Sequence, residues 1–457
     1  MTFSSQKHQV VVSSWSAQLS ESALQTWWQE THNGLRAIEL CDKPGEFSVT
    51  PICLHRSTYQ NITRDLPKIL QLARRISRIG DYGKIWSRED QLHVTQAYED
   101  TPDTPAIGRP DGIFVGNQLK LLELNLGSGV GGFFEVDYVQ SRFKQLTELA
   151  GRADLQAPPA SPALLQTVND LRENSSIEHF HIAILAYRHF RPYHVRQAHQ
   201  LAQRFHDELR ACSCHVVYAD ELHANADWIS DGTRDYHMIW QFGAPMHPPE
   251  LMAPVMSMQI AARSTKTLYV ANPRDMAVEG KLALAALSEN TDRRFFCVSD
   301  EEQALIDAYV PWTRSVKQQT KVSFQGQVFD IQTVLREHRV GLVLKRAHSK
   351  STMQVYIGAE QDDATWQQLI DNAFLEDGQW VIQENLRSPA LEFSYFDAEG
   401  IRHAVTQNFT YNQFVFGANC SAPLIRIERD PSRRKVAMAI SSAMAITGTV
   451  LCENLKG

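Results

Sequence analysis

The segment from residue 108 to residue 127 constrains the fold more than any other part of the sequence. Two β-forming runs, 112–115 and 119–126, lie on either side of Gly116-Asn117-Gln118. A short turn with glycine and asparagine between two such runs is typical of a β-hairpin. We therefore expect an antiparallel sheet that is built around this hairpin.

The register of the hairpin brings polar side chains together. If the hairpin is centred on Asn117, Asp111 lies opposite Glu123 and Arg109 lies opposite Asn125. Glu123 and Asn125 then share one face of their strand, because side chains alternate in direction along a strand. The other face of that strand carries Leu122, Leu124 and Leu126.

Two facing carboxylates repel one another unless a cation or a proton lies between them. Hard oxygen ligands of this kind suit Mg²⁺, so the hairpin is a candidate metal site. The alternative is that Asp111 and Glu123 are only the solvated side of a half-buried hairpin, which is common in antiparallel sheets. The rest of the chain is needed to choose between these interpretations.

The composition is that of a globular protein and narrows the range of partners. The chain has 457 residues, of which 43% are hydrophobic, so it is long enough for several packed units. The formal net charge is −7 and no basic stripe occurs, so we expect no nucleic-acid partner. No apolar run reaches the length of about 18 residues that spans a membrane. Scattered cysteines and the lack of a signal-peptide core predict a cytoplasmic protein.

The middle of the chain alternates strand-like and helix-like segments. Strands are expected at 181–186, 216–218, 238–242 and 267–270, and helices at 195–210 and 251–260. This alternation predicts parallel βαβ units and a small doubly wound domain.

The flanking regions are mixed. Before the middle region we expect helices at 16–36, 62–78 and 138–149, and a strand at 47–54. After it we expect strands at 340–345, 380–384, 393–396 and 424–427, and helices at 364–374 and 436–445.

The glycines of Gly127–Gly132 match the dinucleotide pattern G-x-G-x-x-G, and Glu148 lies where a ribose-binding acid is expected. A NAD-dependent oxidoreductase is therefore one alternative. Against it, the strand before these glycines carries Glu123 and Asn125, whereas the first strand of a dinucleotide-binding fold is apolar on both faces.

Three further polar residues stand at the ends of predicted elements. Lys281 begins a helix after a proline-containing turn, and Lys345 and Glu384 each end an apolar strand. A lysine at a strand end can place a positive charge on a phosphate group. Taken one at a time, each of the three is better explained as a solvated surface residue.

These residues occur as one ordered set of motifs, which comprises Arg109-x-Asp111, Glu123-x-Asn125, Lys281, Lys345 and a strand that ends in Gln383-Glu384. The set resembles the circularly permuted ATP-grasp ligases, and among them the glutathionylspermidine synthetase type. The resemblance implies that Asp111, Glu123 and Asn125 hold Mg²⁺, with two ions expected, on the phosphates of ATP. It also implies that Arg109 assists the reacting acyl phosphate.

The same resemblance implies a nucleotide site. Lys281 and Lys345 are expected to reach ATP, and Gln383, Glu384 and the backbone near Leu386 are expected to hydrogen-bond adenine. The family usually has a glycine-rich flap over the phosphates, whereas residues 347–353 contain no glycine, so Ser349 and its polar neighbours would bind phosphate instead. This departure supports a second alternative, a non-catalytic ATP-grasp-like binding protein.

The resemblance further implies an α/β (α+β) protein with the ATP-grasp fold, a circularly permuted order and an inserted small doubly wound domain. We expect an N-terminal part of the core with the metal-binding hairpin at 1–160, the inserted Rossmann-like domain at 161–275, a lid and nucleotide-binding subdomain at 276–390, and a C-terminal return to the core at 391–457.

The implied reaction is the ATP-dependent joining of a carboxylate to an amine through an acyl phosphate, with release of ADP and phosphate. Its partners would be a small-molecule carboxylate and a small-molecule amine, such as amino acids or a polyamine. The arginines near the C-terminus are candidates to hold the substrate carboxylate, with solvated surface residues as the alternative, and they are Arg426, Arg429, Arg433 and Arg434.

Overall fold

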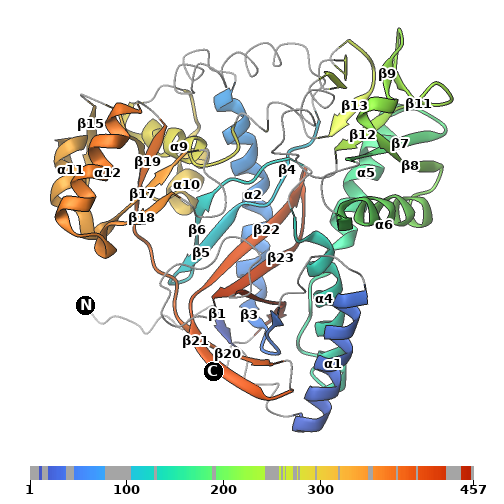
Figure 1. Ribbon diagram of the computed structural model, residues 1–457, viewed down its shortest axis with the longest axis horizontal. Helices are drawn as coiled ribbons and strands as arrows, with labels where there is room; N and C mark the ends of the chain where they lie inside the picture. Colours follow the sequence, from blue (N-terminus) through green and yellow to red (C-terminus); the bar gives the residue numbers. More distant parts are fainter. Residues whose placement is uncertain are drawn as a thin grey trace.

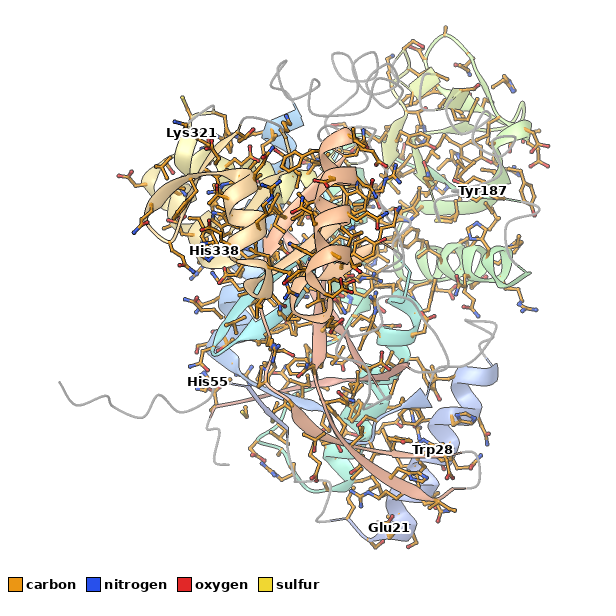
Figure 2. All side chains as sticks on the ribbon, turned by 60° about the vertical axis from the view of Figure 1, so that its left-hand side comes forward. Glu21, Trp28, His55, Tyr187, Lys321 and His338 are labelled. Atoms are coloured by element: carbon orange, nitrogen blue, oxygen red, sulfur yellow. The ribbon has the colours of Figure 1, made fainter. Side chains whose placement is uncertain are left out.

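The computed structural model shows a mixed α/β protein (Figure 1). It describes residues 10–12, 19–37, 46–77, 104–127, 131–187, 192–241, 257–258, 261–262, 264–270, 275, 278–293, 296–317, 320–347, 354–376, 379–397, 400–428 and 444–453. Two lobes, at the upper left and upper right of Figure 1, flank a central sheet, and Figure 2 shows Lys321 and His338 in one lobe and Tyr187 in the other.

The central sheet joins the predicted hairpin to the C-terminal part of the chain. Its strand order is β2-β24-β23-β22-β5-β6, and β4 pairs with β22 outside this path. The strands are β2 (Glu46–Phe47), β4 (Ile107–Gly108), β5 (Asp111–Val115), β6 (Gln118–Glu123), β22 (Phe409–Phe416), β23 (Asn419–Glu428) and β24 (Met444–Thr447).

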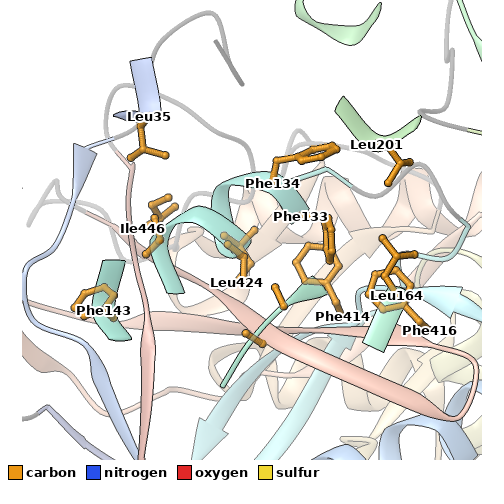
Figure 3. Close-up of a cluster of buried hydrophobic side chains, with 14 of the residues drawn as sticks. Leu35, Phe133, Phe134, Phe143, Leu164, Leu201, Phe414, Phe416, Leu424 and Ile446 are labelled. Atoms are coloured by element: carbon orange, nitrogen blue, oxygen red, sulfur yellow. The ribbon is translucent and has the colours of Figure 1, made fainter. Parts of the chain in front are cut away.

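Helices cover both faces of the central sheet because its strands alternate apolar residues between two cores. One core contains residues of α1 (Glu21–Ala37), α4 (Phe133–Leu149) and α5 (Ser161–Ser175). In Figure 3 this core includes Phe133 of α4 and Phe414 of β22. The other core contains residues of α2 (Arg56–Ser77), α9 (Leu282–Arg293) and α10 (Asp300–Tyr309).

Asp111 pairs with Glu123 in the hairpin, as predicted, but the register that produces this pairing differs from the predicted one. The turn is Gly116-Asn117, so the pairs nearest to it are displaced by one residue from a register centred on Asn117. Leu122 then forms a β-bulge, and this extra residue restores the predicted pairing of Asp111 with Glu123. Beyond the bulge, the backbone N–H of Arg109 donates to the carbonyl of Asn125 at 2.7 Å, as predicted.

Because of the bulge, the leucines of this strand are buried in a different pattern from the one expected. Leu119 and Leu121 before the bulge, and Leu124 and Leu126 after it, belong to the same core. Leu122 is half-buried, so the prediction that it shares a face with Leu124 and Leu126 is wrong. The extra residue reverses the alternation of side chains, which keeps apolar residues on the core side of both halves of the strand.

The lobe at the right of Figure 1 contains a parallel sheet, as the sequence predicts. Its strand order is β13-β12-β7-β8, and all its pairs are parallel. The elements are β7 (Phe180–Ala186), α6 (Pro192–Glu208), β8 (Cys212–Tyr218), β12 (Met238–Gln241) and β13 (Leu268–Val270). Most of the expected helix at 251–260 lies outside the described residues.

The lobe at the left contains a small antiparallel sheet with the order β14-β19-β17-β18, which we call the side sheet. Its strands are β14 (Thr313–Ser315), β17 (Leu342–Arg346), β18 (Val355–Ile357) and β19 (Trp380–Glu384). The same lobe contains β15 (Lys321–Phe324), β16 (Gln327–Asp330), α11 (Ile331–Glu337) and α12 (Asp363–Leu375). The strands expected at 340–345 and 380–384 are thereby confirmed.

The remaining elements are short. A sheet of order β1-β3-β25 pairs β1 (Val10–Val12), β3 (Ile52–His55) and β25 (Thr449–Cys452). A hairpin is formed by β20 (Leu391–Phe396) and β21 (Arg402–Gln407). Connections contain η3 (Ala219–Glu221), β9 (His223–Ala224), β10 (Ile229–Ser230), β11 (Asp235–Tyr236), η4 (Arg339–Gly341) and η5 (Gly358–Glu360).

The helix predicted at 436–445 is wrong at its C-terminal end, which is the part that the structure describes. The segment 436–445 was expected to be helical from its small residues, but its last residues begin β24, which pairs with β23. Sheet pairing therefore overrides local helix propensity here. Residues 436–443 lie outside the described residues. No helix of the described chain is long and apolar enough to span a membrane.

Candidate active site

Of the two facing acids, Asp111 is buried, and Glu123 is partly buried, with 16% of its side chain exposed. Asp111 is 2% exposed, and its two carboxylate oxygens receive Arg109 Nε at 3.3 Å and Arg426 Nη1 at 3.4 Å. Glu123 Oε1 lies 3.2 Å from Lys281 Nζ. The interpretation of these acids as a solvated hairpin face is therefore wrong for Asp111, whereas Glu123 pairs with a lysine at a partly exposed position.

Arg109 is fixed from several directions. In addition to its bond with Asp111, it donates from Nη1 to the carbonyl of Gly131, and its guanidinium lies 5.8 Å from the ring centroid of Phe414. Asn125 Nδ2 donates to the backbone carbonyl of Arg109 at 3.3 Å. The guanidinium therefore has one defined position beside Asp111.

Gly132 lets the chain pass close to Arg109. Its φ is +93°, and a Cβ at this position would lie 2.8 Å from Leu424 Cδ2 and 3.6 Å from Arg109 Nη1. We expect Gly132→Ala to lower the free energy of unfolding by about 1–3 kcal/mol, because it adds backbone strain and a clash. Urea unfolding measures the effect. Gly131→Ala is the matched control, since its Cβ would meet no atom within 4 Å, and equal losses in both variants would contradict this explanation.

Arg426 reaches the site from a distant part of the chain. It lies on β23, is 3% exposed and contacts Asp111. Burial and the neighbouring Arg109 lower the pKa of Arg426 to about 10, while Asp111 and Glu123 oppose this shift. The sequence suggested a substrate carboxylate as its partner, and an arginine inside an apolar strand was the signal for burial. The other candidate arginines, Arg429, Arg433 and Arg434, lie outside the described residues.

The segment at Lys281 joins the central sheet to the side sheet. Gly280 forms an antiparallel bridge with Leu124 of the hairpin segment, and the backbone N–H of Lys281 donates to Ala347 at 3.4 Å. Lys281 is 3% exposed, and Glu123 is a counter-charge for its ammonium. A lysine that looked like a surface residue in the sequence is therefore part of the buried site.

Lys345 lies in the same polar cluster on the side sheet. Its Nζ donates to Gln383 Oε1, and Gln383 Nε2 donates to Thr313 Oγ1 at 3.0 Å. Burial and the nearby charge of Lys281 lower the pKa of Lys345 to about 7, whereas Glu123 raises it. An ammonium in this position is poorly compensated, so the site favours the arrival of an anion.

The expected adenine-binding residues lie on or after β19. Gln383 is 1% exposed and is already hydrogen-bonded to Lys345, whereas Glu384 is exposed and Leu386 is half-buried. Their roles toward a nucleotide stay predictions. Ser349 and the rest of the expected flap at 348–353 lie outside the described residues.

A cavity in the described part of the chain lies apart from the hairpin and its cationic partners. It has a volume of about 470 Å³ and lies between the end of α2, residues 104–106, α5 and the turn at 417–419. None of the predicted site residues lines it. Within the described ranges, no group of three or more His, Cys, Asp or Glu side chains is placed to hold a metal ion. Mg²⁺ is commonly bound through only one or two carboxylates, so this result does not conflict with the hairpin pair.

The surroundings of Gly127–Gly132 differ from those of a dinucleotide site. The strand before these glycines is β6, which is antiparallel to β5. The dinucleotide motif requires a parallel strand within a βαβ unit, so the hairpin context argues against a NAD-binding role.

Comparison with known proteins identifies a fold but no family. No family model and no curated protein sequence matches the chain. A glutathione synthetase-like effector from Globodera pallida has a TM-score of 0.65 and 11% identity, and the match covers 94% of this chain and 97% of that one. At this identity the likeness shows a shared fold over nearly the whole chain and nothing about activity.

Two other solved structures are less similar. A putative gamma-glutamylcysteine synthetase from Methylobacillus flagellatus has a TM-score of 0.41 and 10% identity, with 85% of this chain and 88% of that chain covered. D-alanyl-alanine synthetase A from Vibrio cholerae has a TM-score of 0.30 and 12% identity, with 58% and 74% covered. These scores are too low to bear on the fold.

Proposed function

We propose that this protein is an ATP-dependent carboxylate-amine ligase that forms an amide or peptide bond through an acyl phosphate and releases ADP and phosphate. The observation that carries the proposal is the pair of acids, buried Asp111 and partly buried Glu123, which is surrounded by arginine and lysine side chains. Buried charges of both signs are costly to maintain and are typical of a site that handles charged ligands.

The residues of the hairpin fit a magnesium site. Asp111, Glu123 and Asn125 offer hard oxygen atoms of the kind that Mg²⁺ prefers, although Arg109, Arg426 and Lys281 already pair with the two acids. When bound there, Mg²⁺ would supply positive charge to the phosphate oxygens of ATP. We propose these residues as the metal ligands, with the ATP-grasp fold and its circular permutation as the framework.

The cationic side chains have separable roles in this proposal. Lys281 and Lys345, at the junction of the central and side sheets, bind the phosphates of ATP. Arg109 and Arg426 flank Asp111 and stabilise the negative charge that develops when the substrate carboxylate attacks the terminal phosphate. The side sheet excludes water from the acyl phosphate, which hydrolyses readily.

The low pKa of Lys345 predicts that ATP binding depends on pH. Burial lowers this pKa to about 7, so the lysine of the free protein loses its proton as the pH rises above that value. The neutral amine cannot pair with a phosphate, so the affinity for ATP falls with rising pH, by up to about tenfold per pH unit. Calorimetric titration between pH 6 and pH 8.5 measures the slope. Lys345→Met should remove it, and exposed Lys321→Met should not; a slope that survives in Lys345→Met would contradict this assignment.

A non-catalytic ATP-binding protein is the second candidate. It is favoured by the absence of glycine from residues 347–353, where a flexible flap over the phosphates is expected. Release of ADP from Mg²⁺ and ATP, with pairs drawn from the amino acids and simple polyamines, distinguishes the two. ADP release that requires both an acid and an amine supports the ligase. If the protein binds ATP and Mg²⁺ but releases no ADP with any pair of acid and amine, it is a non-catalytic ATP-binding protein.

A further inference from the structure

Glu135 is a buried acid beside the proposed acyl-transfer site. It lies in the first turn of α4 and is 7% exposed. Within the part of the chain that the structure describes, its Oε2 atom is buried and has no hydrogen-bond partner. An unsatisfied buried carboxylate oxygen costs folding free energy, so this oxygen is available to a group that donates a hydrogen bond.

The residues at the start of α4 lie close to Arg109. Gly131, just before the helix, accepts a hydrogen bond from Arg109, and the space beside Gly132 is taken by Arg109 and Leu424. Glu135 follows within one helical turn, and the charge of Arg109 is near enough to lower its pKa. The acid and the arginine proposed to act on the acyl phosphate therefore belong to one site.

The surroundings of Glu135 suit proton transfer. Burial raises its pKa to about 7, and a backbone hydrogen bond and the charge of Arg109 only partly oppose this shift. A carboxyl group with a pKa near the working pH is able both to accept and to release a proton. Amide formation requires this, because an alkylamine is protonated at neutral pH and has no free electron pair for attack.

We infer that Glu135 accepts a proton from the amine substrate, and that a primary ammonium group is the partner of its Oε2 atom. This inference rests on the proposed ligase function and assigns the amine side of the reaction to the start of α4. Opposite charge and N–H donors make an ammonium group complementary to a buried carboxylate.

The proposed step balances. A primary ammonium gives one proton to the Glu135 carboxylate, which frees the electron pair of nitrogen. Nitrogen attacks the acyl carbon, the C–N bond forms, and the C–O bond to phosphate breaks with its electron pair leaving on phosphate. The second proton lost by nitrogen passes to phosphate. The products are the amide, hydrogen phosphate and a protonated Glu135, which returns its proton to solvent.

Hydroxylamine provides the test, because it is largely unprotonated at neutral pH and needs no base before it attacks an acyl phosphate. In Glu135→Gln, we expect amide formation with an alkylamine to fall on the order of 10²-fold, while hydroxamate formation from the same carboxylate stays unchanged. Glu135→Asp, which keeps a carboxylate, should recover part of the amide formation. Exposed Glu148→Gln on the same helix is the matched control and should change neither rate.

Each other outcome overturns the inference. Equal loss of amide and hydroxamate in folded Glu135→Gln would place Glu135 in ATP binding, carboxylate activation or structural support. Unchanged amide formation would show that no base is needed from this residue. If Glu135→Gln does not fold, the same two rates are measured in Glu135→Asp. Loss of hydroxamate formation together with amide formation in that variant would again contradict the assignment. A wild type that makes neither product, even with bound ATP, would overturn the proposed ligase function itself, and this inference with it.

Discussion

Replacing Glu123 by glutamine is expected to lower ATP-dependent ADP release on the order of 10³-fold, or about 4 kcal/mol in transition-state stabilisation. Glutamine keeps the shape of the side chain but removes the charge that faces Asp111 across the hairpin. Mg²⁺ would lose a carboxylate ligand, and the phosphates of ATP would lose the charge that the metal supplies. The rate is measured by a coupled ADP assay with the acid and amine pair that the wild type uses.

The control for this variant must separate binding from folding. Glu123 is a counter-charge of buried Lys281, so thermal unfolding of Glu123→Gln is followed in parallel with the assay. Exposed Glu148→Gln repeats the chemical change on α4 and should leave the rate unaltered. A folded Glu123→Gln protein within about tenfold of the wild-type rate would show that this carboxylate is not a metal ligand.

Arg109→Lys is expected to lower the rate of the chemical step by about 10²–10³-fold while the affinity for ATP changes little. The guanidinium of Arg109 contacts Asp111, the carbonyl of Gly131 and the face of Phe414 at once. The ammonium of lysine is a compact point charge and cannot reproduce this planar arrangement. Single-turnover measurements separate the chemical step from ATP binding.

Arg152→Lys is the matched control, because Arg152 pairs with exposed Asp154 away from the hairpin. It should be neutral in both rate and affinity. If Arg109→Lys weakened ATP binding by the same factor as it slowed the reaction, Arg109 would act in ground-state binding rather than in acyl phosphate formation.

The sequence predicted the hairpin and its key contact because both depend on local information. A Gly-Asn turn and alternating side chains place Asp111 near Glu123 within a few residues of uncertainty. The bulge at Leu122 was missed, although the adjacent leucines Leu121 and Leu122 interrupt the alternation of apolar and polar residues at that point. The predicted contact therefore holds although the register at the tip is displaced.

The remaining parts of the site depend on long-range packing. Arg426 reaches Asp111 from a strand 315 residues away in the sequence, and no local pattern encodes that distance. Glu135 resembles an ordinary first-turn acid of a helix in the sequence, and only the fold shows that its side chain is buried. The parallel strands around β7 were easier to predict, because alternating apolar strands and helices are a local signal of βαβ order.

Transfer of ¹⁸O from the substrate carboxylate to inorganic phosphate tests the proposed acyl phosphate most directly. The carboxylate that supports ADP release is labelled with ¹⁸O and incubated with the protein, Mg²⁺, ATP and the amine. Attack of the carboxylate on the terminal phosphate predicts that each phosphate released carries one ¹⁸O atom. Phosphate without label, or label in AMP, would contradict an acyl phosphate and with it the assignment of the Asp111 and Glu123 hairpin to an ADP-forming ligase.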